Sequence, residues 1–76
     1  MSMKKNKKIS EGFGENVRFY RMSAGLTQQE LADETLLHVN FIGRIERGSV
    51  NPSLISIIYI SNALKISPMD LIRGIS

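Results

Sequence analysis

The chain has 76 residues, a formal net charge of +3 and no cysteine, which fits one small domain and excludes disulfides and thiolate metal sites. Its one histidine, His38, cannot build a zinc site alone. No apolar run approaches the roughly 18 residues that cross a membrane. The basic start MSMKKNKK lacks the apolar segment of a secretory signal. We expect a cytoplasmic protein without a membrane anchor, cofactor or metal.

Positive charge is concentrated at the start of the chain. Four lysines lie within the first eight residues, whereas the remaining chain has six Lys and Arg against seven Asp and Glu. We therefore expect residues 1–9 to form a flexible basic arm on a nearly neutral domain of residues 10–76. Such arms commonly meet nucleic acid. A solvated, disordered end without a partner is the alternative.

Helical periodicity without strand alternation predicts an all-α domain of five helices. The first helix is expected from about Ser10 to Ala24, with Gly25 as a left-handed cap. Its core face consists of Phe13, Val17, Tyr20 and Ala24. Phe19 falls on the polar side of this helix, and the sequence offers no reason for it.

The second and third helices are short and closely spaced. The second, over about 27–35, begins with a capping box of Thr27 and Glu30 and a hydrophobic staple of Leu26 and Leu31. The third, over about 38–47, has His38 as its cap and Gly48 as its end. Its inward residues are Ile42 and Ile45, with Phe41 at their edge and Leu37 as a staple partner of Ile42.

The last two helices are expected over about 52–64 and 67–73, because Asn51-Pro52 and Ser67-Pro68 each place a cap before a proline. Asp70 adds a weaker capping box. Their core residues are Leu54, Ile57, Ile60, Ser61, Leu64 and Leu71. The apolar residues left over predict a homodimer interface of Ile55, Ile58, Tyr59, Met69, Ile72 and Ile75. The alternative is that several of them fill the small core.

Two short helices joined by a three- or four-residue turn form a helix-turn-helix, whose second helix enters the DNA major groove. The outward positions of the third helix include Val39, Asn40, Gly43 and Arg44. Asn pairs with adenine and Arg with guanine through two hydrogen bonds each, and an apolar side chain can touch a thymine methyl group. A close groove wall would explain a glycine in the helix. The alternative is that Asn40 and Arg44 are ordinary solvated positions.

Gln28 and Gln29 open the second helix. Their amides and the free N–H groups of the helix N-terminus form a candidate phosphate site. The alternative is that they are two exposed helix formers.

The segment LTQQELADETLLHVNFIGRIERGSVNPSL, residues 26–54, resembles the helix-turn-helix of the xenobiotic-response-element family. That family includes lambda-type phage repressors and the controller proteins of restriction–modification systems. The resemblance extends over roughly residues 13–72 and depends on LTQQELA, RIERG and NPSL. It implies a compact five-helix, lambda-repressor-like dimer whose operator has two half-sites.

The resemblance also implies roles for individual residues. Val39, Asn40, Gly43 and Arg44 would face bases, and Gln28 would bind phosphate. Arg21 and Glu46 would form an ion pair between the first and third helices, while Arg18 and Arg47 are further candidates for phosphate contacts. Leu36 stands where the family often has Gly or Asn with positive φ, and Val39 where controller proteins commonly have Arg.

The sequence therefore predicts a dimeric, sequence-specific transcriptional regulator, most similar to a restriction–modification controller acting on a palindromic or pseudo-palindromic operator. Its partners would be double-stranded DNA, a second copy and, further, RNA polymerase. A phage-type repressor, an antitoxin or a protein-interaction module of the same fold are alternatives. No paired nucleophile and base, phosphate-cradling loop or metal cluster indicates an enzyme, and no small-molecule ligand is evident.

Overall fold

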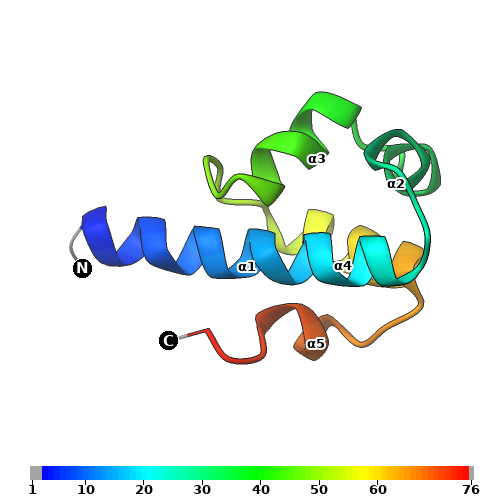
Figure 1. Cartoon of the computed structure of the whole chain (residues 1–76). Coiled ribbons are helices and arrows are strands. Elements are labelled where there is room, and N and C mark those ends of the chain that lie inside the picture. Colours follow the sequence, from blue (N-terminus) through cyan, green and yellow to red (C-terminus); the bar gives the residue numbers. More distant parts are fainter. Residues whose placement is uncertain (1–2, 76) are drawn as a thin grey trace.

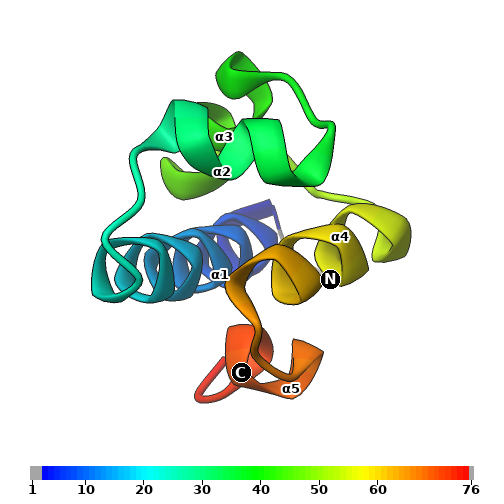
Figure 2. The same ribbon diagram turned by 90° about the vertical axis from the view of Figure 1, so that its right-hand side faces the viewer.

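The computed structural model describes residues 3–75, with the side chains of residues 6–75. Over this range the chain forms five helices and no strand: α1 (Met3–Ser23), α2 (Gln28–Thr35), α3 (Val39–Glu46), α4 (Leu54–Leu64) and α5 (Pro68–Ile72). The helices α1 and α4 form a middle layer, with α2 and α3 on one side of it and α5 on the other (Figure 1 and Figure 2). The all-α architecture expected from the sequence is confirmed.

Every helix contributes to one hydrophobic core. Val17, Leu31, Ile42, Ile60 and Leu71, one from each helix in chain order, have no exposed surface. Burying an aliphatic side chain of this size stabilises a fold by about 1.5–3 kcal/mol. Because α3 places Ile42 in this core, its opposite side is fixed toward solvent.

The first helix begins earlier than expected. It starts at Met3, so the boundary near Ser10 is wrong, and the expected flexible arm is helical over the residues described. Residues 1–2 of that arm lie outside the described part. The segment before Gly12 contains neither proline nor glycine, and lysine is a good helix former, so nothing ends the helix earlier. Ala24, expected in the core, follows the helix and is exposed, whereas Gly25 has the expected positive φ of 74°.

The helices α1 and α3 are in close contact at Gly14. A methyl group at this position would overlap the carbonyl oxygen of Ile45 at the end of α3. Gly48 then turns the chain with a φ of 75°, and a Cβ there would lie 2.6 Å from Cγ of Glu11. These two glycines therefore let the end of α3 lie directly on α1.

The fourth helix begins later than expected and has a different cap. It starts at Leu54 rather than near Pro52, because the hydroxyl of Ser53 accepts a hydrogen bond from the backbone N–H of Ser56 (3.1 Å). Leu54, expected in the core, is 73% exposed, and Ser56 is buried instead. The proline therefore precedes the cap and does not occupy the first turn.

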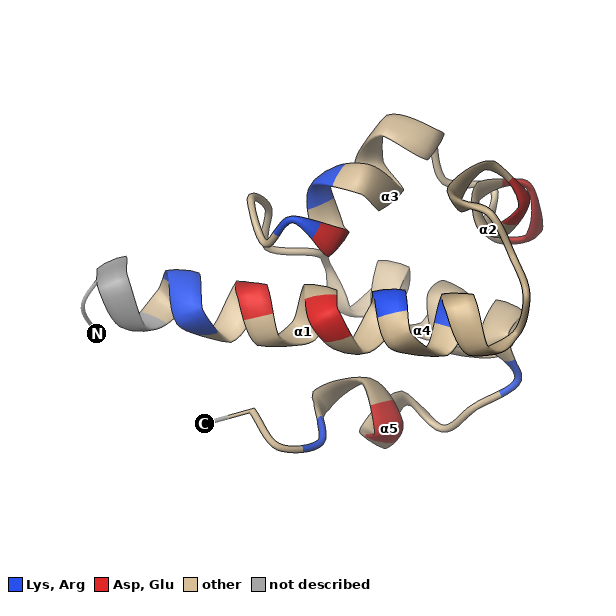
Figure 3. Cartoon of the chain, viewed as in Figure 1, with Lys and Arg blue, Asp and Glu red and all other residues tan. Residues whose placement is uncertain are grey.

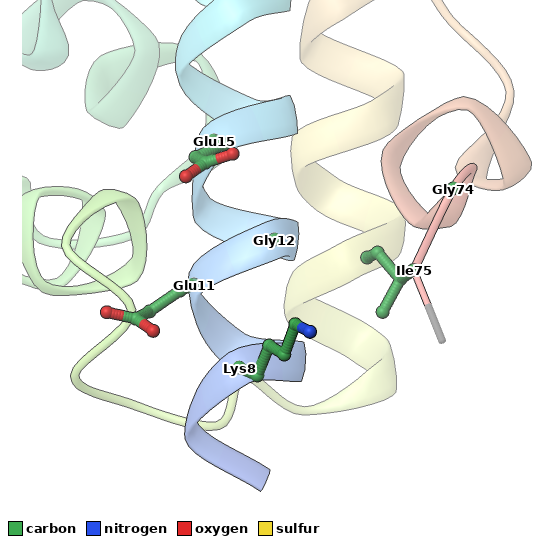
Figure 4. A pocket seen from close by; sticks show the side chains of 6 residues that line it. All are labelled: Lys8, Glu11, Gly12, Glu15, Gly74 and Ile75. Atoms are coloured by element: carbon green, nitrogen blue, oxygen red, sulfur yellow. The ribbon is translucent and has the colours of Figure 1, made fainter. Parts of the chain in front are cut away.

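The chain after α5 returns to α1. Ile75, expected at a dimer interface, is half-buried against the core and faces Gly12, where a Cβ would lie 3.5 Å from its Cγ1 (Figure 4). The Asn16 amide fixes this return by donating hydrogen bonds to the carbonyl oxygens of Leu71 (2.8 Å) and Arg73 (3.1 Å). Ile75 is thus better explained as part of the fold.

Candidate nucleic-acid interface

The helices α2 and α3 form the expected helix-turn-helix, and local caps define both of its helices. The Thr27 hydroxyl accepts from the Glu30 N–H (3.0 Å), and the Glu30 carboxylate accepts from the Thr27 N–H (2.9 Å). His38 caps α3 by accepting the Asn40 N–H at Nδ1 (3.0 Å). The capping box and the histidine cap predicted from the sequence are confirmed.

The turn between the two helices bends at Leu36. This residue has a φ of 63° and a ψ of 14°, the left-handed conformation, and its side chain is 91% exposed. Such a conformation costs a residue with a Cβ roughly 1–2 kcal/mol. Leucine therefore brings strain to the turn without adding to the core.

The outward side of α3 carries Asn40 and Arg44, both exposed and one helical turn apart. Residues spaced by four lie next to each other on a helix, so the two side chains can reach neighbouring positions of one groove. Val39 is half-buried and packs partly against the core. Asn40 and Arg44 thus make up the polar part of the face, with Val39 at its edge.

Gly43 does not belong to this exposed face, and its expected assignment to it is wrong. The residue is buried. A Cβ here would lie 3.2 Å from Nη1 of Arg47 and 3.6 Å from Oε1 of Gln28. Side chains of the protein itself therefore cover this position, and no groove wall is needed to explain the glycine.

An ion pair links α1 to α3, as the family resemblance implied. Arg21 donates from Nε to Oε2 of Glu46 (2.6 Å) and from Nη2 to Oε1 (3.0 Å), and its Nη1 donates to the Leu26 carbonyl (2.8 Å). The two side chains are only 12% and 4% exposed. The hydrogen bond to Glu46 raises the pKa of the Arg21 guanidinium, while burial acts in the opposite direction. The pair is structural and lies behind the exposed face of α3.

Gln28 belongs to the same network, which the sequence analysis missed. Its Nε2 donates to Oε1 of Glu46 (3.1 Å), so this amide connects α2 with α3. Its neighbour Gln29 donates to Oδ1 of Asp33 (2.8 Å) along the exposed side of α2. The available sequence signal was its spacing, because Gln28 precedes the inward Leu31 by three residues and so lies near it on α2.

Three arginines near α3 have no carboxylate partner among the described residues. Arg18 on α1, Arg44 on α3 and Arg47 directly after α3 are all exposed, and the ion pairs found in this part of the chain use Arg21 and Arg73 instead. Figure 3 shows basic residues on both α1 and the C-terminal half of α3. Their charges remain available to an anionic partner.

Exposed apolar side chains are concentrated on α4 and α5, on other surfaces than Asn40 and Arg44. The exposed members are Leu54, Ile55, Ile58, Tyr59, Met69 and Ile72. Scattered apolar residues are normal on a surface, but so many on two adjacent helices are typical of an interface. Of the residues expected at the dimer interface, only Ile75 is half-buried within the protomer.

Among the side chains that the structure describes, no group of three or more His, Asp or Glu could hold a metal ion.

Within residues 3–75, no helix is both long enough and apolar enough to cross a membrane.

Comparisons of this chain with known proteins, by sequence and by structure, all find helix-turn-helix proteins. Residues 17–71 match the helix-turn-helix family. Control protein C.BamHI of Bacillus amyloliquefaciens is 46% identical over 61 residues, covering 79% of this chain and 75% of that protein. Control protein C.SmaI of Serratia marcescens is 39% identical over 64 residues, which cover 84% of this chain and 76% of that protein. The crystal structure of the restriction–modification controller protein C.AhdI from Aeromonas hydrophila matches with a TM-score of 0.80 and 37% identity, over 82% of this chain and 94% of that one.

Proposed function

This chain belongs to the helix-turn-helix family, among the control proteins of restriction–modification systems, and from that premise we propose that it is a DNA-binding transcriptional regulator. The observation that carries the proposal is the exposed polar face of α3. Asn40 and Arg44 point away from the core, while Ile42 and Ile45 on the same helix are buried. The helix is therefore anchored on one side and free on the other.

Base reading is assigned to three residues of this face. Arg44 presents the planar fork that matches a guanine edge, and Asn40 presents the amide that matches adenine. Val39 can contact a thymine methyl group with the exposed part of its side chain. Each bidentate pair discriminates against a wrong base by about 1–3 kcal/mol. Gly43, being buried, is left out of this set.

Phosphate contacts would set the position of α3 in the groove. Arg18 and Arg47 flank the reading face and carry unpaired positive charge among the described residues. The N-terminus of α2 adds free backbone N–H groups. The amides of Gln28 and Gln29 complete the set, although each also makes a hydrogen bond within the protein. Affinity should therefore fall steeply with salt.

We further propose that two copies assemble through α4 and α5. A two-fold dimer would bury Ile55, Ile58, Tyr59, Met69 and Ile72, which are exposed in the single chain. Leu54 extends this surface at the start of α4. A dimer of helix-turn-helix domains presents two reading helices about 34 Å apart, one turn of DNA. The operator is thus expected to be palindromic or pseudo-palindromic.

Selection of bound duplexes from random-sequence DNA, at a stated salt concentration, tests the proposal. We expect a consensus with two related half-sites. Substitution of Asn40 or Arg44 by Ala should weaken binding to that consensus by roughly 5- to 150-fold, from a loss of 1–3 kcal/mol. The matched control is Arg73→Ala, which removes an exposed cation from the end of α5. If no consensus emerges, or if the α3 variants bind as the control does, the fold serves protein interaction and not DNA reading.

A further inference from the structure

We propose that Lys7, near the start of α1, binds a DNA phosphate beside the groove that α3 reads. The inference rests on the proposed function and adds a contact outside the helix-turn-helix. It uses a part of the chain that the sequence suggested would be a flexible arm. The helical structure gives this lysine a defined direction instead.

Lys7 lines a groove between α1 and the loop that follows α3. The groove also contains Asn6 and Ser10 from α1, and Ser49 and Asn51 from the loop. The Ser49 hydroxyl donates to the Arg44 carbonyl (3.1 Å), which holds the loop against the end of the reading helix. The groove therefore lies at the end of α3, where Arg47 directly precedes the lining residue Gly48.

Helical spacing places Lys7 on the α3 side of α1. Gly14, which contacts the end of α3, follows Lys7 by seven residues, two helical turns, and Arg18 follows Gly14 by one turn. Lys7 and Arg18 thus lie on the same stripe, on either side of the point where α3 rests. A duplex over α3 would meet a cation from α1 at both ends of this stripe.

Lys8 lies on a different side of the same helix. It borders a cleft with Gly12 and Ile75, on the side where the end of the chain returns (Figure 4). Glu11 and Glu15 also line that cleft, although the Glu11 carboxylate is turned away from Lys8. An acid beside Lys8 opposes the approach of a phosphate, because like charges repel.

The charges of the two sites therefore differ, although the two lysines are adjacent in sequence. The groove of Lys7 is lined by one cation and several polar donors, and the one acid at its border is Glu11, which packs against Gly48. The cleft of Lys8 has Glu15 in addition, so fewer carboxylates oppose an anion at Lys7 than at Lys8. Double-stranded DNA supplies such an anion at every nucleotide step.

The test measures how DNA affinity depends on salt for Lys7→Gln and Lys8→Gln. Glutamine is a good helix former, so α1 should be retained in both variants. Each lost phosphate contact reduces the slope of log affinity against log salt by about 0.9. We expect that reduction for Lys7→Gln, with a similar loss of affinity for the selected consensus and for random duplex. Lys8→Gln should leave the slope close to the wild-type value, and Lys7→Arg should restore it.

An unchanged slope in Lys7→Gln would overturn the inference. Equal reductions in both glutamine variants would also overturn it, because they would indicate general attraction by the net charge and no localised contact. Neither result affects the proposed function, which depends on a selected consensus and on weaker binding to it by Arg44→Ala.

Discussion

Glu46 connects α3 to both of its neighbouring helices in the helix-turn-helix region. Its carboxylate accepts hydrogen bonds from Arg21 of α1 and from Gln28 of α2, and its side chain is 4% exposed. One buried charge thus ties α3 to both of its neighbours. Loss of either donor would leave the carboxylate incompletely paired, which is unfavourable in a buried site.

Replacement of Arg21 by Met should destabilise the protein by about 3–5 kcal/mol, because it strands the buried charge of Glu46. Urea unfolding followed by circular dichroism measures the effect. Arg73→Ala is the control, since Arg73 pairs with Asp70 at the surface (2.9 Å) and its side chain is 70% exposed. That variant should lose no more than about 1 kcal/mol. Equal losses in the two variants would contradict a structural role for the Arg21 pair.

Two helical glycines should respond differently to alanine, because different atoms lie around them. At Gly43 the new methyl group meets only the ends of the Arg47 and Gln28 side chains. These can move, so Gly43→Ala should be neutral or gain up to about 1 kcal/mol of helix propensity. At Gly14 the methyl group meets the backbone of α3, which cannot move without separating the helices.

We therefore expect Gly14→Ala to lose several degrees of melting temperature and Gly43→Ala to lose none. Thermal unfolding of both variants under identical conditions measures the difference. Tolerance of alanine at Gly14 would argue against the close packing of α1 on α3.

At the scale of elements, the turn between α2 and α3 combines well-formed caps with a strained residue. Thr27 and His38 cap the two helices through short hydrogen bonds. Between them Leu36 has a positive φ and a side chain that is 91% exposed. The turn is thus determined by its flanking helices and not by its own sequence.

Leu36→Asn should stabilise the protein by about 0.5–1 kcal/mol, because asparagine tolerates the left-handed conformation better than leucine. No buried apolar contact is lost at so exposed a position. For a domain of this size the gain corresponds to a few degrees of melting temperature. Met22→Asn, at an exposed position with helical backbone, serves as the control and should show no gain. A lower melting temperature in Leu36→Asn would contradict the strain argument.

Elements whose ends depend on local chemistry could be predicted from the sequence. The capping boxes at Thr27 and Ser67 and the glycine that ends α3 are examples, since each involves residues within a few positions. The predicted start of α4 was wrong because Ser53 and Asn51 are both good caps, and packing decides between them. The predicted start of α1 was wrong because a run of lysines is equally compatible with disorder and with a helix.

The candidate site was predictable only where it depends on helical spacing. Periodicity placed Asn40 and Arg44 on the outward side correctly. Gly43 was predicted on the same outward side but is buried, because the side chains of Gln28 from α2 and Arg47 from the end of α3 cover it. Such coverage depends on how side chains from two elements meet, which a single helical pattern does not contain.

At the scale of the whole molecule, the two proposed functional surfaces lie on different parts of the fold. The proposed reading face belongs to α3, in the layer above the α1–α4 pair, whereas the proposed dimer surface belongs to α4 and α5 (Figure 2). Dimerisation through that surface would therefore leave the outward side of α3 uncovered. Because the chain is small, pairing through this surface would also contribute to its stability.

Ile55→Asp should prevent dimerisation, because it places a charge in the proposed apolar interface. Phe19→Asp is the matched control: Phe19 is 63% exposed, close to the 65% of Ile55, but lies on α1 outside that surface. Sedimentation analysis should give a monomer for Ile55→Asp and a dimer for the control. A dimer in both, or a monomer only for Phe19→Asp, would place the interface elsewhere.

Selection of random duplexes with the Arg44→Ala variant determines whether the outward side of α3 reads bases. We expect the variant's consensus to lose its preference for guanine at one position in each half-site and to keep the rest, including the half-site spacing. A consensus identical to that of the wild-type protein, recovered with the same affinity, would show that this side of α3 does not read bases through Arg44.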